Sequence, residues 1–478
     1  MTFQLQPGTY QSYKGLPTLA GLATLEQAAA CQWSVEESVT RWKRLHYVLK
    51  RLHELFTARI TAEPIYELKT AFSHHAYLCA EQVTLIRKRV SEMREPPLGL
   101  DKVPHAGLQR LMDEILCCPE TEGLLLGVYQ VVVPEVVAAC ARLRDQAHPL
   151  ADAPTVRAAK LIHFEMTEVA QFGQRAISCL VDAPKNTQWQ AWLSALQQCL
   201  AAAGSLDGSC ATAGPCALPP AQYSQQPYEY QGEPRRDERF RDSYNAGVNA
   251  EAFLYDEHFP ARAKTLMMYY KRLREIDVPE MMASIIYELR DEEPWEFHME
   301  MSRQLWDEAR HAMMGEVGFV AQGIDWREIP INFTWSRNLN LQLPARERHG
   351  VLFFIEQGLM PRTGKRYEWE VGLASGDRLS GLFQDYDWAD EVLHAQIGRR
   401  WYVPRYKSLG EALAFGDRCW TKVVSHWRDY LQQGLTEHRN WWPELYAAAC
   451  KNWGVTPDAQ ALAFHQTYED SRADLQKL

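Results

Sequence analysis

The chain reads Trp306-Asp307-Glu308-Ala309-Arg310-His311 at one point and Trp388-Ala389-Asp390-Glu391-Val392-Leu393-His394 at another. Both stretches contain Asp-Glu-x-x-His, and Ala follows the His directly in each. On an α-helix, a Glu and a His three residues apart project from the same face, so a carboxylate oxygen and an imidazole nitrogen can bind the same metal ion. Charged helices produce a single copy of this spacing by chance. The repetition therefore makes metal binding the central hypothesis.

A dinuclear site in a four-helix bundle needs two further carboxylates, one from each of the other two helices. The turn at 291–295 pairs the preceding helix with the helix at 295–320, and this places Glu308 opposite residues 275–280. Glu280 is therefore the preferred ligand from the first helix, and Glu275 is the alternative. On the third helix an apolar run ends at Glu356. A carboxylate there is costly to bury unless it is paired or bound to a metal, or else it lies at the exposed end of its helix.

The predicted metal site consists of four Glu and two His residues, namely Glu280, Glu308, His311, Glu356, Glu391 and His394. Oxygen ligands predominate, which favours iron or manganese, since zinc sites are usually tetrahedral and rich in Cys and His. Asp307 and Asp390 precede two of the ligands and are candidates to accept a hydrogen bond from the outer N–H of a ligand His. Alternatively, each Asp is a surface charge or pairs with Arg310, Arg399 or Arg400.

Helical periodicity and turn residues predict an all-α fold in four parts. Residues 1–200 are predicted to form an N-terminal helical bundle, 201–240 a Gly/Pro/Ser-rich linker, 241–403 the metal-binding bundle, and 404–478 a C-terminal helical extension. Residues 364–376 are expected to continue the third helix irregularly. We expect the N-terminal bundle to be a degenerate, metal-free relative of the metal-binding bundle, because its acidic and His residues form no Glu-x-x-His pair. These residues are His74, His75, Glu81, Glu122, Glu165 and Glu168.

Composition and charge limit the class of protein. An apolar fraction of 46% and a charged fraction of 23% are ordinary for a soluble globular protein. The net charge of −10 argues against a general binder of nucleic acid or anionic membranes. The eleven cysteines are scattered, and the first residues show no basic segment leading into an apolar run. We therefore expect a cytoplasmic protein that binds neither nucleic acid nor membranes.

With these residues in place, the chain resembles the ferritin-like di-iron carboxylate superfamily, which includes ribonucleotide reductase small subunits, bacterial multicomponent monooxygenases and arylamine N-oxygenases. The resemblance rests on 307–311 and 390–394 with Glu356 between them. It is specific over about 275–400 and weak over 60–185. The chain also resembles uncharacterised bacterial ferritin-like proteins that share Trp-Asp-Glu-Ala-Arg-His-Ala-Met-Met-Gly. It departs from the usual pattern at Pro279, which directly precedes Glu280.

The resemblance implies a ferritin-like four-helix bundle with two iron ions, or with manganese or a mixed iron and manganese centre. It implies a non-haem oxidoreductase that uses dioxygen as co-substrate to oxidise a small organic molecule by hydroxylation, desaturation, N-oxygenation or halogenation. An external electron donor is expected, because the sequence has neither a Gly-x-Gly-x-x-Gly fingerprint nor a clustered iron–sulfur Cys motif. The alternative is an iron-binding or a structural and interaction protein without turnover. Such folds are commonly homodimers.

Overall fold

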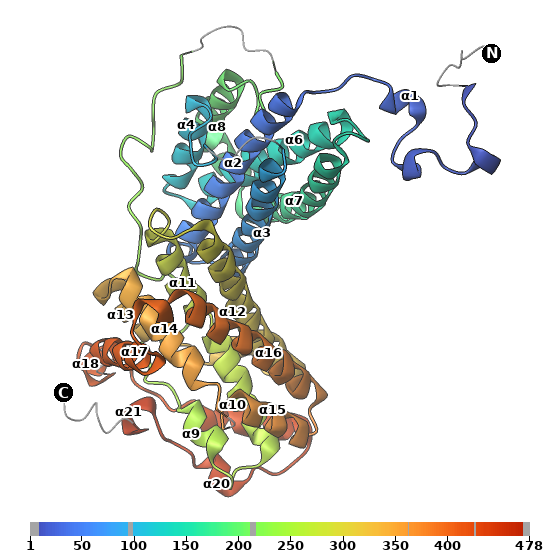
Figure 1. Cartoon of the computed structure of the whole chain (residues 1–478). Helices are drawn as coiled ribbons and strands as arrows, with labels where there is room; N and C mark the ends of the chain where they lie inside the picture. Colours follow the sequence, from blue (N-terminus) through green and yellow to red (C-terminus); the bar gives the residue numbers. More distant parts are fainter. Residues whose placement is uncertain (1–8, 94–98, 211–216, 362, 425–426, 472–478) are drawn as a thin grey trace. The chain divides into compact units, whose positions relative to one another are not determined.

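The computed structural model describes residues 9–93, 99–210, 217–361, 363–424 and 427–471. Within these residues the fold is all-α, without a β-strand (Figure 1). The predicted class, an all-α helical-bundle fold, is confirmed. The chain divides into two compact units: unit 1 contains 1–55 and 78–229, and unit 2 contains 56–77 and 230–478.

Unit 1 is built from long helices and one π-helical segment. Its elements are α1 (Leu25–Ala28), α2 (Val35–Ala62, as far as residue 55), α3 (Tyr66–Ser91, from residue 78), α4 (Ala106–Leu116), α5 (Thr121–Leu125), the π-helix η4 (Leu126–Val132), α6 (Val133–Gln146), α7 (Ala153–Leu180) and α8 (Ala183–Ala202). Helix α6 packs along α7, and α4 packs against α8. By length and composition the stretch Thr121–Gln146 could cross a membrane, but 67% of its most apolar window is buried inside the protein. A core helix of a bundle has the same properties.

The described part of the predicted linker makes specific contacts. Buried Glu114 on α4 accepts hydrogen bonds from the backbone N–H groups of Gln222, Tyr223 and Ser224, and from the Ser224 hydroxyl. These residues belong to unit 1, which extends to residue 229, and unit 2 resumes at residue 230.

Unit 2 contains both Asp-Glu-x-x-His stretches, the first on α12 (Trp295–Ala321) and the second on α16 (Arg378–Trp401). These helices pack against each other and against two pairs of consecutive helices, each pair separated by a short break. The first pair is α10 (Ala261–Arg274) and α11 (Asp277–Glu288), and the second pair is α14 (Ala345–Gly358) and α15 (Lys365–Ala374). The remaining elements are α9 (Ala250–Tyr255), η5 (Trp326–Glu328), α13 (Thr334–Gln342), η6 (Val403–Arg405), α17 (Leu409–Val423), α18 (Trp427–Gln432), α19 (Trp442–Trp453), α20 (Ala459–Leu462) and α21 (Tyr468–Ser471).

The structure differs from the predicted organisation in three respects. The stretch that was expected to be irregular forms the regular helix α15 after a short break. The C-terminal extension shares a core with the bundle, since Trp442 packs against Phe253 of α9 at 4.7 Å between ring centroids. Residues 56–77, the end of α2 and the beginning of α3, belong to unit 2. A division by sequence order alone does not anticipate this last assignment.

Close helix packing in unit 2 depends on Gly315 of α12. A Cβ added there would lie 2.2 Å from the backbone nitrogen of Leu273 and 2.6 Å from the backbone oxygen of Tyr269, both on α10. We expect Gly315→Ala to destabilise unit 2 by about 1–3 kcal/mol, because the two helix backbones must move apart. The matched control is Gly358→Ala at the end of α14, where an added Cβ meets no atom within 4 Å. Equal urea midpoints for the two variants would contradict this account.

Candidate metal centre

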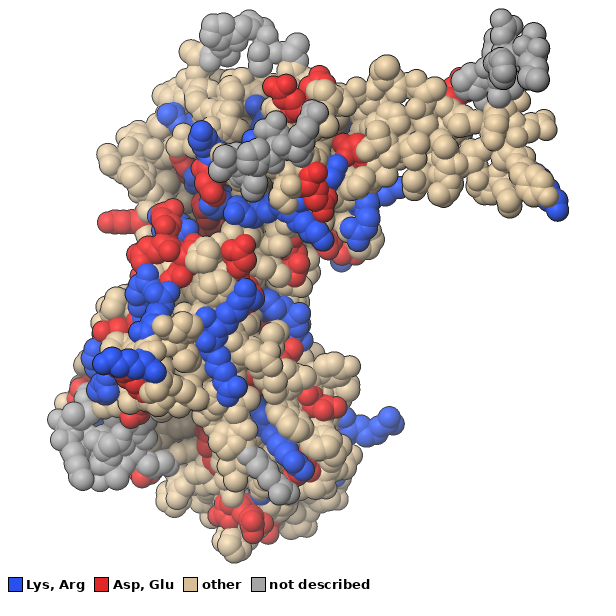
Figure 2. Space-filling model, in the orientation of Figure 1, with Lys and Arg blue, Asp and Glu red and all other residues tan. Residues whose placement is uncertain are grey.

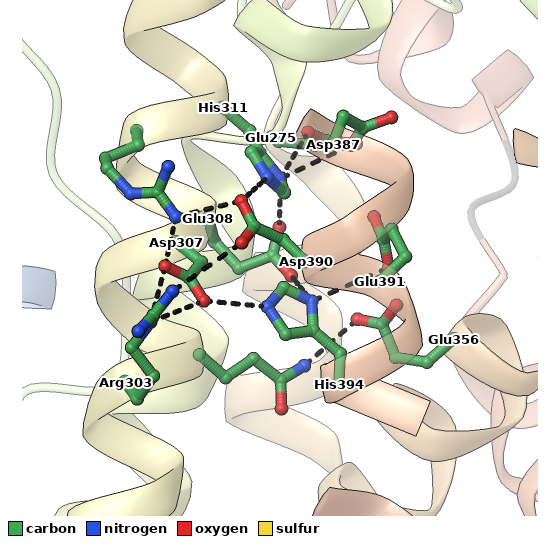
Figure 3. Close-up of polar contacts among 12 residues, drawn as sticks. Glu275, Arg303, Asp307, Glu308, His311, Glu356, Asp387, Asp390, Glu391 and His394 are labelled. Carbon is green, nitrogen blue, oxygen red and sulfur yellow. Dashed lines mark hydrogen bonds and ion pairs between the residues drawn. The ribbon is translucent and has the colours of Figure 1, made fainter. Parts of the chain in front are cut away.

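Carboxylates and imidazoles converge in the interior of unit 2 as three overlapping sets (Figure 3). Within each set the ligand atoms lie within 4.8 Å of one another. The sets are Glu308, Glu356, Glu391 and His394; Glu275, Glu308 and His311; and His311, Asp387 and Glu391. They come from α12, α14, α16 and the residue that follows α10. Every member except the half-buried Glu275 is buried.

Glu308 lies between the two imidazoles. Its Oε1 is 3.1 Å from Nδ1 of His394, and its Oε2 is 3.6 Å from Nδ1 of His311. Glu391 Oε2 is 3.5 Å from the same nitrogen of His394, and Glu275 Oε2 is 3.5 Å from that of His311. The ring centroids are 6.0 Å apart. Both imidazoles therefore present Nδ1 to a shared interior space.

The outer imidazole nitrogens contact the two Asp residues in a crossed arrangement. Nε2 of His394 is 3.3 Å from Oδ2 of Asp307, and Nε2 of His311 is 3.2 Å from Oδ2 of Asp390. Each Asp thus contacts the imidazole of the other Asp-Glu-x-x-His stretch. Arg310 forms ion pairs with both carboxylates. Hydrogen bonding to a His and pairing with an Arg, which the sequence left as alternatives, occur together at each Asp.

Several buried atoms that face this space make no hydrogen bond of acceptable geometry within the described residues. They are Oε2 of Glu275, Glu356 and Glu391, Oε1 of Glu308, and Nδ1 of His311 and His394. Leaving a buried polar atom unpaired costs about 1–3 kcal/mol, so folded proteins rarely do so. A divalent cation bound in one of the convergent sets would satisfy the unpaired oxygen and nitrogen atoms of that set. The donor set therefore fits a metal ion, and its predominance of oxygen suits iron or manganese.

Crowded carboxylates also shift the pKa values in the cluster. Burial, together with the neighbouring Glu391, raises the pKa of Glu356 well above its usual value. Burial disfavours the charged form of His311, but hydrogen bonds to Asp390 and other carboxylates outweigh it and raise the pKa of His311 to about 10. Metal ions bind carboxylate and neutral imidazole, so a bound metal ion would displace these protons.

Two buried cations border the cluster. Lys365 Nζ is 2.8 Å from Oε1 of Glu391 and 3.0 Å from Oδ1 of Asp387. Arg272 forms an ion pair with Asp387 and lies 2.8 Å from Oε1 of Glu275. Neither cation nor Asp387 is among the site residues predicted from the sequence. Asp387 precedes Glu391 by four residues and so shares its helix face, a spacing that contained the missing signal.

Glu280 does not lie in this cluster, which corrects the preference for it over Glu275. Its fully buried carboxylate is 2.8 Å from Nζ of Lys69 and 3.0 Å from an NH2 nitrogen of Arg236. Glu275 occupies the expected position beside His311. Glu275 directly follows α10 and Glu280 lies in the first turn of α11, so the interruption between the two helices turns the two side chains toward different partners.

The remaining predicted ligands, Glu308, His311, Glu356, Glu391 and His394, all lie in the cluster. The alternative of an exposed helix end does not hold for Glu356, whose residue is 4% exposed. Of the other arginines considered as partners of the Asp residues, Arg399 donates to Gln357 and Arg400 pairs with Glu300.

Candidate residues of the N-terminal bundle have other contacts. Glu165 accepts a hydrogen bond from Nε2 of Gln82 at 3.0 Å, and Glu122 pairs with Lys185. His75 is buried and belongs to unit 2. All three convergent sets described above lie in unit 2. That the N-terminal bundle holds no metal stays a prediction.

No protein-family model matches this chain, and no characterised protein or solved structure is detectably similar to it. The fold and the site together define a class: an all-α protein whose second unit is a helical bundle with a buried cluster of Glu, Asp and His residues suited to a metal ion. Membership of the ferritin-like superfamily stays a prediction from the sequence.

Removing an outer hydrogen-bond acceptor tests the crossed arrangement. Asp307→Asn should lower metal affinity about 10- to 100-fold, because Asp307 orients the His394 ring and increases its basicity. The affinity is measured by Mn(II) titration with a competing chelator. Asp325→Asn, which alters an exposed ion pair with Arg327, is the control and should leave the affinity unchanged. Equal affinities for the two variants would show that Asp307 does not act on His394.

Proposed function

We propose that unit 2 binds iron or manganese and, with dioxygen as co-substrate, oxidises a small organic molecule. The observation that carries the proposal is the convergence of unpartnered ligand atoms from Glu308, Glu356, Glu391 and His394 at one buried point. A bound redox-active metal ion would supply the electrons that dioxygen accepts, with an external donor restoring them.

The surrounding residues support this chemistry by position and charge. Asp307 and Asp390 hold the two imidazoles with Nδ1 turned inward. Arg303 and Arg310 each pair with both Asp carboxylates and together balance their charge. Because Glu308 and His394 are 2% and 1% exposed, large molecules cannot reach the cluster directly. A closed, water-poor site also strengthens electrostatic interactions within it.

The surface favours a small substrate over a polyanion. On the face shown in Figure 2, Lys and Arg side chains lie among Asp and Glu side chains instead of forming one basic surface. The net charge of −10 points the same way, because nucleic-acid binding depends on clustered positive charge.

A second candidate function is favoured by the ion pairs of Lys365 and Arg272. These cations already neutralise part of the cluster, as they would in a charged helical core that serves structure alone. In that case the protein would bind metal weakly or not at all and would have no oxidase activity.

The test is metal binding followed by oxygen consumption. The full chain is loaded anaerobically with Fe(II), freed of excess metal and analysed by elemental mass spectrometry, and oxygen uptake is then followed with a chemical reductant. Bound iron with uptake above that of a Glu308→Gln variant supports the oxidase. Bound iron without such uptake indicates an iron-binding protein. Failure to retain iron or manganese would favour the structural candidate.

A further inference from the structure

We infer that Lys365 takes the place of one of two metal ions, so that the site holds a single ion among Glu308, Glu356, Glu391 and His394. This inference rests on the proposed metal function and replaces the dinuclear centre expected from the sequence with a mononuclear one. It comes from the uneven distribution of cationic side chains across the cluster.

In the half of the cluster around His394, Glu391 is the one carboxylate with a cationic partner among the described residues. Its Oε1 pairs with Lys365, and its Oε2 is left without a hydrogen bond. Within the described residues no lysine or arginine forms an ion pair with Glu308 or Glu356, although both are buried. Among the described residues Glu356 accepts a hydrogen bond from the Gln304 amide at 3.1 Å, and its second oxygen has no partner. This half therefore combines unpaired carboxylate oxygens with a free Nδ1, which is the arrangement a divalent ion fills.

The half around His311 is already supplied with positive charge. The Lys365 ammonium lies between Glu391 and Asp387, at 2.8 Å and 3.0 Å from their oxygens. The Arg272 guanidinium pairs with Asp387 and Glu275. Glu308 is the only carboxylate of the two sets containing His311 without such a cation among the described residues. An ion placed there would compete directly with Lys365 for Asp387 and Glu391.

Charge balance leads to the same stoichiometry. The cluster contains five carboxylates, and with Lys365, Arg272 and neutral imidazoles it has three net negative charges. One divalent ion reduces this to one negative charge. Without Lys365 and Arg272 the five carboxylates would need two divalent ions to reach that same single negative charge, so the two cations together supply the charge of one divalent ion.

The position of Lys365 is built into the backbone. Lys365 is the first residue of α15 and is 1% exposed, and its N–H donates to the backbone oxygen of Leu359 across the break between α14 and α15. At Gly364 a Cβ would lie 2.1 Å from that same Leu359 oxygen, so the close turn requires glycine there. The break therefore places an ammonium group where an uninterrupted third helix would not.

The test is Mn(II) stoichiometry in the full chain, measured by elemental mass spectrometry, with electron paramagnetic resonance to separate isolated from coupled ions. We expect one Mn(II) per chain in the wild type and a twofold rise, with a coupled signal, in Lys365→Met. Lys365→Arg should keep a single ion. The matched control is Lys264→Met, another buried lysine of unit 2 whose partner at 2.9 Å is the neutral hydroxyl of Tyr367. Lys264→Met should also bind one Mn(II) ion per chain.

Each outcome is decisive. Two ions in the wild type would overturn the inference and leave the proposed metal function standing, whereas no bound ion would overturn the proposed function itself. A single ion in both wild type and Lys365→Met would show that Lys365 does not exclude a second ion. If Lys365→Met does not fold, Lys365→Gln, which removes the charge and keeps a polar side chain, gives the same comparison.

Discussion

Glu308→Gln is expected to abolish metal retention, because among the described residues Glu308 is the one carboxylate that contacts the inner nitrogens of both imidazoles. The amide keeps the shape of the side chain but removes its charge and replaces one ligand oxygen with NH2. The loss should exceed the roughly 10- to 100-fold drop expected when an outer partner such as Asp307 is changed. It is measured as metal per chain after Fe(II) or Mn(II) loading, with helicity followed by circular dichroism.

The control for this change is Glu165→Gln in unit 1. Glu165 is also a helical glutamate, but it accepts its hydrogen bond from Gln82 and lies outside the three convergent sets. We expect this variant to retain wild-type metal content and helicity. Metal retained at the wild-type level by Glu308→Gln would mean that the cluster is not the binding site.

Lys69→Met should produce the largest loss of stability, at about 3 kcal/mol. It leaves the fully buried Glu280 carboxylate with Arg236 as its remaining cationic partner, and breaking a buried ion pair on one side costs about 3–5 kcal/mol. Because Arg236 still pairs with Glu280, we expect a loss of unfolding free energy at the lower end of this range. The Lys69 ammonium also donates to the backbone oxygen of Ile60 at 2.9 Å, and this hydrogen bond is lost as well. Guanidinium unfolding measures the change.

Lys422→Met is the matched control. Lys422 pairs with Glu347 at 2.9 Å, but its side chain is 56% exposed, so water and salt screen the interaction. This variant should unfold close to the wild-type midpoint. If Lys69→Met unfolds at the same midpoint as the control, the buried ion pair does not stabilise unit 2.

The ligands that repeat along one helix could be predicted from the sequence. Glu308 and His311, like Glu391 and His394, are three residues apart, and helix geometry alone places each pair on one face. Glu356 could be predicted because a carboxylate that ends an apolar run needs a buried partner. These inferences require only a helix, which the periodicity of the surrounding residues predicts.

Features that depend on helix breaks could not be predicted in the same way. The choice between Glu275 and Glu280 depends on the interruption between α10 and α11, because a break resets which residues face the bundle interior. Lys365 reaches the cluster only because α14 and α15 are separated at Leu359 and Gly364. The periodicity of apolar residues predicts the faces of a continuous helix. It does not predict the direction that the next helix takes after a break.

The sequence by itself therefore determined the all-α class and the residue types of the site, because side-chain direction along a helix follows from local backbone geometry. Only the tertiary structure decided which helices face one another. In the tertiary structure Asp307 contacts His394 and Asp390 contacts His311. Residues 56–77 belong to unit 2, and Glu280 pairs with Lys69. Contacts between residues distant in the chain arise from packing, and helix periodicity carries no information about which partner a face will meet.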